Sequence, residues 1–119
     1  MKAVLFRAIS LIVVFSLAAC AEMAAQQDLS AGKAAYQSGK LDEAAAWFEK
    51  AAEQGNSEAQ QMLFDMARDN AEAVRWVRKE AKRGNSEAQF TLAAMYLKGQ
   101  GVAQDYKQAN YWYRKAAGQ

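Results

Sequence analysis

The chain of 119 residues contains no histidine, no proline and a single cysteine, Cys20. Without histidine, the protein lacks the most common general base and the most common metal ligand. One cysteine cannot form a disulfide within the chain or a thiolate zinc cluster. The absence of proline and the abundance of alanine favour uninterrupted helices. The composition therefore disfavours metalloenzymes, histidine-dependent nucleophilic enzymes and disulfide scaffolds, and it favours a small all-helical protein.

The chain also lacks a large excess of one charge. It carries 15 Lys and Arg against 13 Asp and Glu, and two of the basic residues, Lys2 and Arg7, lie in a segment that we expect to be removed. The remaining chain is formally neutral, which argues against nucleic-acid binding. Residues 21–74 nevertheless hold 4 basic and 10 acidic residues, whereas residues 75–119 hold 9 and 3. One explanation of this asymmetry is that the two halves meet head-to-tail between copies of the chain.

The first residues have the pattern of an export signal. Lys2 and Arg7 precede an apolar run over residues 8–19, interrupted only by two serines. Twelve helical residues rise about 18 Å, well short of the roughly 30 Å hydrocarbon core of a membrane. The pattern therefore predicts a signal peptide over residues 1–19 that is removed from the mature protein.

The end of this run, Leu17-Ala18-Ala19-Cys20, resembles the bacterial lipobox. The resemblance implies cleavage between Ala19 and Cys20, and acyl chains on Cys20 that anchor the protein to a membrane. It also implies the bacterial envelope, with sorting to the outer membrane and the protein facing the periplasm, because Ala21 and not Asp follows the cysteine. An alternative is ordinary signal-peptidase cleavage, which would leave a soluble periplasmic protein. Residues 20–27 are predicted as the acylated cysteine and a short extended tether.

A repeated sequence occupies residues 28–119. The segment from Gly55 to Gln60 recurs unchanged from Gly84 to Gln89, 29 residues later. A segment that begins with tryptophan occurs three times, at residues 47–52, 76–81 and 112–117. Such internal repetition predicts a stack of similar units. The three repeats are expected near 28–56, 57–85 and 86–119.

Each repeat is expected to form two antiparallel helices joined by a short loop. The expected helices cover residues 28–38 with 41–54, 57–69 with 71–83, and 86–98 with 105–117. Gly55 and Gly84 suit the left-handed residue that ends a helix. Ser57 and Ser86, each followed three residues later by glutamine, have the form of capping boxes, and Asp105 has the same form.

Residues at equivalent positions of the repeats are expected to pack the helices together or to form the turns. These positions are Tyr36, Gly39, Trp47, Gly55, Leu63, Trp76, Gly84, Leu92, Tyr96, Gly99, Gly101, Asp105 and Trp112. Three aromatic residues, Phe90, Tyr106 and Tyr111, lie outside the repeat positions. They are expected to leave an apolar surface on the last repeat, although terminal repeats normally need a polar outer face. Such a surface is either covered by a partner or a second copy, or tolerated in so short an array.

The third repeat carries the fullest motif. It contains Leu92-Ala93, Tyr96, Gly99-x-Gly101-Val102, Asp105 and Trp112-Tyr113. This pattern resembles the Sel-one-like repeat (SLR), a relative of the tetratricopeptide repeat. The resemblance covers residues 28–117 and implies a short right-handed αα superhelix, or solenoid, of about three helix-turn-helix repeats. It also implies a concave surface that binds protein partners, and no reaction.

The second repeat departs most from this motif, with Ala67 and Asn70 at the tyrosine and glycine positions and a shortened loop. Its second helix carries five basic residues at helical spacing. These residues, here called the basic stripe, are Arg75, Arg78, Lys79, Lys82 and Arg83. The basic stripe is either a docking surface for an acidic protein or anionic lipid, or a solvated face that neighbouring glutamates partly neutralise.

The sequence thus predicts an exported, lipid-anchored, non-enzymatic interaction module or adaptor. The concave face, including 61–65 and 91–98, would bind an unidentified protein partner. An alternative is a periplasmic inhibitor or immunity-type protein that sequesters one toxin or enzyme. An enzyme acting on the cell wall is a more distant alternative, because the adjacent acids Asp42 and Glu43 diverge on a helix and suit its first turn. No catalytic, metal-binding or cofactor-binding residue is predicted.

Overall fold

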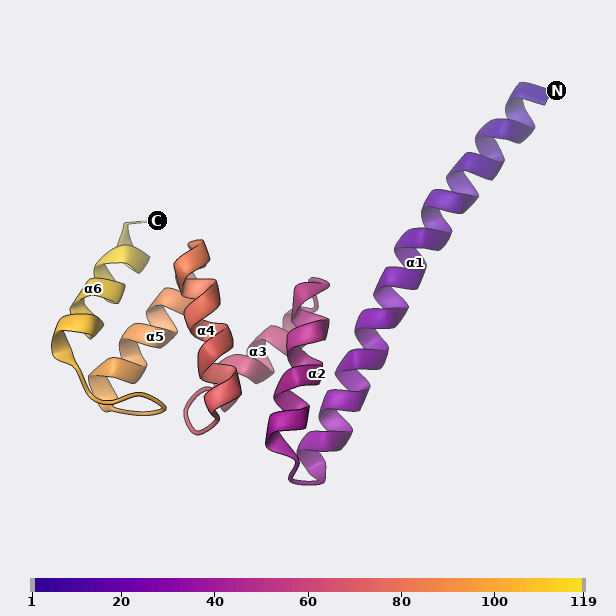
Figure 1. Ribbon diagram of the computed structural model, residues 1–119. Helices are drawn as coiled ribbons and strands as arrows, with labels where there is room; N and C mark the ends of the chain where they lie inside the picture. Colours follow the sequence, from indigo (N-terminus) through magenta and orange to yellow (C-terminus); the bar gives the residue numbers. More distant parts are fainter. Residues whose placement is uncertain (1, 119) are drawn as a thin grey trace.

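The computed structural model describes the backbone of residues 2–118 and the side chains of residues 19–118. Its helices are α1 (Lys2–Gln37), α2 (Leu41–Glu53), α3 (Ser57–Met66), α4 (Ala71–Arg83), α5 (Ser86–Lys98) and α6 (Tyr106–Ala117). Neighbouring helices are antiparallel, and the pairs α1–α2, α3–α4 and α5–α6 stack in sequence order (Figure 1). Residues 2–118 contain no strand. The predicted all-α class and helical-repeat solenoid are confirmed.

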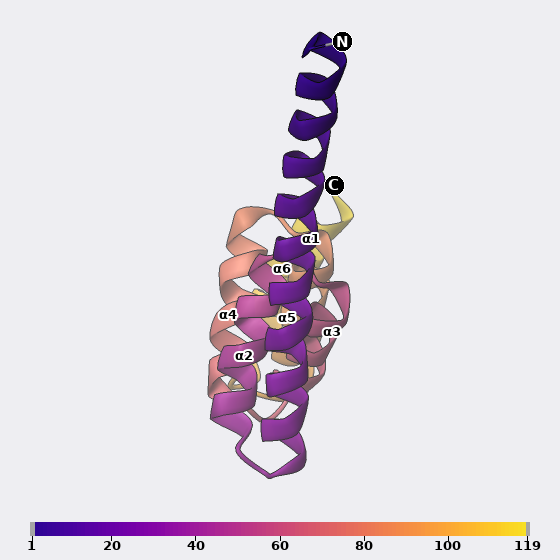
Figure 2. The same ribbon diagram turned by 90° about the vertical axis from the view of Figure 1, so that its right-hand side faces the viewer.

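α1 is much longer than the helix predicted over residues 28–38. Its N-terminal half projects beyond the other helices, and its C-terminal half lies along α2 (Figures 1 and 2). Residues 21–27, predicted as an extended tether, are helical, and Ala25 is already buried. The helix continues because this segment has no glycine or proline to end it. The export signal predicted over residues 1–19 falls almost wholly outside the described side chains.

A glycine inside α1 allows the first helix pair to pack closely. A β-carbon at Gly32 would lie 2.6 Å from the ring of Phe48 on α2. The ring can therefore rest on the α1 backbone, where Phe48 is 0% exposed. Glycine costs a helix interior roughly 0.5–1 kcal/mol relative to alanine. Burial of a large apolar side chain contributes about 1.5–3 kcal/mol, which outweighs that cost.

The core continues through the later pairs. Trp76 and Trp112 are buried, and the ring of Trp76 meets that of Phe64 edge-on at 5.1 Å between centroids. Leu63 and Leu92 are fully buried, whereas Trp47 and Tyr96 are half-buried against this core.

Tyr36 departs from its expected packing role, because 45% of its surface is exposed. α1 is the first helix of the stack, so no preceding pair covers it (Figure 1).

The turns between repeats are built from glycine and asparagine. Gly84 ends α4 in the left-handed region, at φ +102°. Asn85 and Asn56 then cap α5 and α3, because each side chain accepts the backbone N–H three residues on, at 3.1 and 2.9 Å. The capping boxes predicted at Ser57 and Ser86 were therefore wrong by one residue. At the last helix, Asp105 is the cap, as predicted.

The second repeat is shortened at its centre. α3 ends at Met66, three residues before the predicted end at residue 69. Asn70 must adopt an extended backbone because it caps α4, accepting the Ala73 N–H at 3.0 Å. The Asn70 side chain also donates to Asp42 at the start of α2, at 3.0 Å. This asparagine therefore joins the first two repeats at the position where the motif has glycine.

The Gly-x-Gly-Val loop of the third repeat contacts the second repeat. Gly101 has φ +74°, and a β-carbon there would overlap the carbonyl oxygen of Ala67 and lie 2.9 Å from the Met95 methyl group. Only glycine satisfies both the left-handed backbone and this close approach. The loop is thus part of the interface between repeats.

We predict that G101A destabilises the protein more than G39A. Gly39 has φ +77° but nothing within 4 Å of its β-position. G39A should therefore lower the free energy of unfolding by about 1–2 kcal/mol, through backbone strain alone. G101A should cost a further 1–3 kcal/mol, roughly, from overpacking. Urea unfolding of the purified proteins measures the difference, and equal losses would contradict the contact between repeats.

Candidate functional site

A groove lies between α3 and α5, the first helices of the second and third repeats. Its volume is ≈ 310 Å³. The lining residues are Gln61, Phe64, Asp65, Arg68, Glu87, Phe90, Thr91, Ala94, Met95, Lys98 and Gln100. The structure thus brings together the two segments, 61–65 and 91–98, that the sequence analysis placed on the binding face.

The groove combines an apolar floor with charged walls. Phe64 and Met95 are buried beneath it, whereas Phe90 is 59% exposed. The Phe90 ring is held edge-on against Tyr113 of α6, at 5.4 Å between centroids. Asp65 and Arg68 line the groove from the α3 side. An exposed ring above apolar residues, with charges of both signs beside it, suits a protein segment better than a small polar ligand.

One hydrogen bond crosses the groove, from Gln61 Nε2 on α3 to Glu87 Oε1 on α5, at 2.8 Å. Sequence analysis missed Arg68 and Glu87 as groove residues. For Glu87 a signal was present, because two polar contacts between neighbouring repeats, Gln61 with Glu87 and Lys79 with Glu53, have the same separation of 26 residues.

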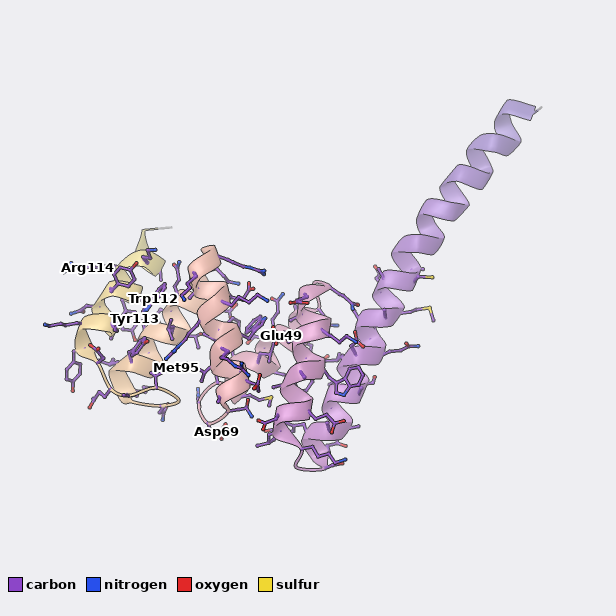
Figure 3. The ribbon with its side chains drawn as sticks, in the orientation of Figure 1. Glu49, Asp69, Met95, Trp112, Tyr113 and Arg114 are labelled. Atoms are coloured by element: carbon purple, nitrogen blue, oxygen red, sulfur yellow. The ribbon has the colours of Figure 1, made fainter. Side chains whose placement is uncertain are left out.

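The basic stripe divides into paired and unpaired charges. Lys79 Nζ lies 3.3 Å from a carboxylate oxygen of Glu53 and 3.7 Å from one of Glu49, both on α2. Glu49 lies between α2 and α4 (Figure 3). Arg75 pairs with Glu72, and Arg83 pairs with Glu80 at 3.0 Å. Part of the basic stripe therefore pairs with glutamates of the same chain and helps to stabilise the fold.

Arg78 and Lys82 are exposed, and neither makes an ion pair with any side chain among residues 19–118. The part of the basic stripe that is available to a partner is thus narrower than the sequence suggested.

The aromatic residues expected on the last repeat are exposed but do not form one patch. Phe90 and Tyr113 line a hollow beside the start of α5, whereas Tyr111 lines another on α6. Lys115 Nζ lies 5.4 Å from the Tyr111 ring centroid. Tyr106 is 63% exposed, and its hydroxyl accepts from the Gln104 side chain at 3.1 Å.

Much of the acid in the first half is paired within the chain. Five of its glutamates, Glu43, Glu49, Glu53, Glu58 and Glu72, pair with Lys or Arg of the same chain. The charge asymmetry is therefore partly neutralised between repeats, which weakens charge as a reason for head-to-tail assembly.

Cys20 is exposed on α1, five residues before Ala25, the first buried residue of this helix among those whose side chains are described. A hollow of ≈ 640 Å³ lies nearby, between residues 19–27 of α1 and the turn at 54–56. The buried residues of α1 begin at Ala25. Cleavage before Cys20 would therefore keep every described packing residue of α1.

Among the described residues, no group of three or more His, Cys, Asp or Glu could hold a metal ion. The same part of the chain has no helix that is long and apolar enough to cross a membrane. The groove residues offer carboxylates, amides and cations without a nucleophile next to a base.

Stacked antiparallel helix pairs with a groove between first helices define a short α-solenoid of the helical-repeat class. The Sel1 repeat family matches residues 18–56, 59–85 and 86–119, and the chain belongs to this family. Sel1 repeat proteins generally act in protein–protein interaction, and the fold is typically a non-enzymatic scaffold.

Two solved structures resemble the chain. A Sel1 repeat protein from Oxalobacter formigenes is 30% identical, with a TM-score of 0.53 over 92% of this chain and 89% of that one. A protective antigen of uropathogenic Escherichia coli with an SLR fold is 33% identical, with a TM-score of 0.53 over 79% of this chain. The match covers 22% of the antigen, so this chain spans about a fifth of its length. A comparison with curated proteins gave no match.

We predict that K79Q lowers stability, whereas R78Q does not. Lys79 bridges α4 to two glutamates of α2, but its side chain is 43% exposed, so the loss should be below about 1 kcal/mol. Arg78 has no such partner. Urea unfolding should show a difference at low salt that disappears in 1 M salt, roughly, where screening is short-ranged. Equal effects of the two substitutions would contradict the assignment.

Proposed function

We propose that this protein is a lipid-anchored interaction module of the bacterial envelope, which uses the α3–α5 groove to bind a protein partner at the periplasmic face of the outer membrane. The observation that carries this proposal is the groove itself, which is lined by Phe90, 59% exposed, together with the buried Phe64 and Met95. Large exposed aromatic residues above an apolar floor are typical anchors of protein interfaces.

The charged residues on the walls of the groove would orient a bound partner. Arg68 and Lys98 can pair with acids of a partner, and Asp65 and Glu87 can pair with its cations. Such rim charges contribute mainly to specificity and association rate, whereas a desolvated ring supplies most of the affinity. A helical or extended peptide segment of mixed charge, with one apolar side chain placed against Phe90, fits this arrangement.

The anchor is proposed at Cys20. Its exposed position, before the first buried residue of α1, leaves the thiol accessible and the packed part of the helix whole. Two or three acyl chains bind a membrane far more firmly than one. The lipobox resemblance supplies the chemistry, and the structure supports it by placing the cysteine at the border of the folded body.

We predict that F90A abolishes partner capture. Full-length tagged protein would be crosslinked in cells, and proteins captured from the membrane fraction would be identified by mass spectrometry. Removing a central aromatic anchor costs roughly 2 kcal/mol or more of binding free energy, which lowers affinity about 30-fold. The matched control is Y106A, because Tyr106 is equally exposed, at 63%, but lies outside the groove.

The proposal that the groove is the binding site is supported if one dominant protein is captured by the wild type and by Y106A but not by F90A. Loss of that protein in Y106A as well, or its retention in F90A, would contradict the proposal. If the captured protein is an enzyme or toxin that this chain inhibits, the module acts as an inhibitor through the same groove.

We predict that acylation requires Cys20. Cells would be labelled with an alkyne fatty acid, and the N-terminal peptide of the purified protein would be weighed. The wild type should carry label and begin at an acylated Cys20, whereas C20S should carry none. Fractionation alone does not decide this, because uncleaved residues 1–19 could also hold C20S at a membrane. An unlabelled wild type, or one that begins at another residue, would contradict the anchor.

A further inference from the structure

Cys20 and the ends of three helices lie at one edge of the solenoid. α2, α4 and α6 run in the same direction, so their C-terminal turns share this edge (Figure 1). The hollow beside Cys20 is lined by Gln54, Gly55 and Asn56, which directly follow α2. The acylation site of the proposed function and the last turns of these helices therefore face the same side of the molecule.

The last turns of α4 and α6 are basic. Lys82 and Arg83 end α4, and Arg114 and Lys115 lie in the last turn of α6. We call these four residues the basic edge. All four side chains are exposed. Arg83 pairs with Glu80, whereas Lys82, Arg114 and Lys115 make no ion pair within the part of the chain whose side chains are described.

Several glutamates near this edge are paired within the chain: Glu53 with Lys79, Glu58 with Lys33 and Glu80 with Arg83. Glu87, which accepts a hydrogen bond from Gln61, and the exposed Glu22 beside Cys20 keep their charge. Asp69, in the turn after α3, makes no ion pair within residues 19–118, and Figure 3 shows Asp69 and Arg114 toward opposite edges. The positive charge of this side is therefore concentrated in the last turns of α4 and α6.

We propose that the basic edge contacts the anionic headgroups of the membrane that holds Cys20, and so orients the groove on that membrane. This inference rests on the proposed anchor. Because α1 is helical through Cys20 and packed from Ala25 onward, no flexible tether separates the acyl chains from the fold. The basic edge is thus held near the headgroups, within the range of about 8 Å over which cations attract an anionic surface at physiological salt.

The same placement favours lipid over a soluble acidic protein. A protein partner would have to enter between the anchored edge and the membrane, whereas headgroup phosphates are already there. The basic edge also extends beyond the basic stripe, because it draws Arg114 and Lys115 from α6 and excludes Arg75 and Lys79, which are paired within the chain.

The test uses full-length protein, purified with its own N-terminus and reconstituted into vesicles containing phosphatidylglycerol and brominated lipid. A fluorescent probe is attached at S86C, on the basic edge side, or at D69C, at the opposite edge. The edge variant is K82Q/R114Q/K115Q. Its matched control is K40Q/R75Q/K107Q, which removes the same number of lysines and arginines from exposed positions outside the groove, near the starts of α2, α4 and α6. Circular dichroism checks that each variant is folded.

We expect bromine to quench the S86C probe and not the D69C probe. The quenching should fall on neutral phosphatidylcholine vesicles and in the edge variant, and it should persist in the control variant. Each charge near the surface is worth about a fivefold change in headgroup association, so three should give roughly a hundredfold loss.

Equal quenching at both probes, or equal effects of the two variants, would overturn the proposal that the basic edge contacts the membrane. The mass of the purified protein separates this failure from failure of the anchor. Acylated protein whose S86C probe is not quenched overturns the orientation alone. Unacylated protein overturns the proposed anchor, and with it the orientation that rests on it.

Discussion

Close approach between backbones is the constraint on which this structure depends. Gly32 has no side chain that would keep the Phe48 ring away from α1, and Gly101 seats the loop of the third repeat against the Ala67 carbonyl. Alanine is the most frequent buried residue, and its small side chain lets neighbouring helices pack at short range. A single helix pair could not bury both of its faces. The fold therefore depends on contacts between pairs as much as on contacts within them.

The same stacking creates the functional surfaces. First helices from successive repeats stand side by side, so Phe90 of α5 and Asp65 of α3 line one groove. The second helices of the repeats run in one direction, so the basic last turns of α4 and α6 lie at the same edge of the solenoid. Polar contacts between repeats, such as Lys79 with Glu53, use up part of the charge that the sequence displays. The charged side chains that stay unpaired within the chain are those available to a partner or a membrane.

Much of the fold could be predicted, because glycine and asparagine mark the ends of successive repeats, at Gly55-Asn56 and Gly84-Asn85. Most helix ends fell within a residue or two of their predicted places. The errors have local causes. Asn56 and Asn85 cap the helices in place of the neighbouring serines, and Asn70 ends α3 early because its backbone must be extended. The groove was only partly predictable, since Arg68 belongs to no repeated motif, and Glu87, although it lies in the repeated segment 84–89, faces α3 only once the repeats are stacked.

The central claim is that the α3–α5 groove binds a protein partner. It is tested most directly by a photocrosslinking amino acid at Thr91, inside the groove, compared with the same amino acid at Asn110, exposed on the outer side of α6. Full-length protein irradiated in cells should form one dominant protein adduct from position 91 and none from position 110. Adducts of equal strength from both positions, or from position 110 alone, would contradict the account.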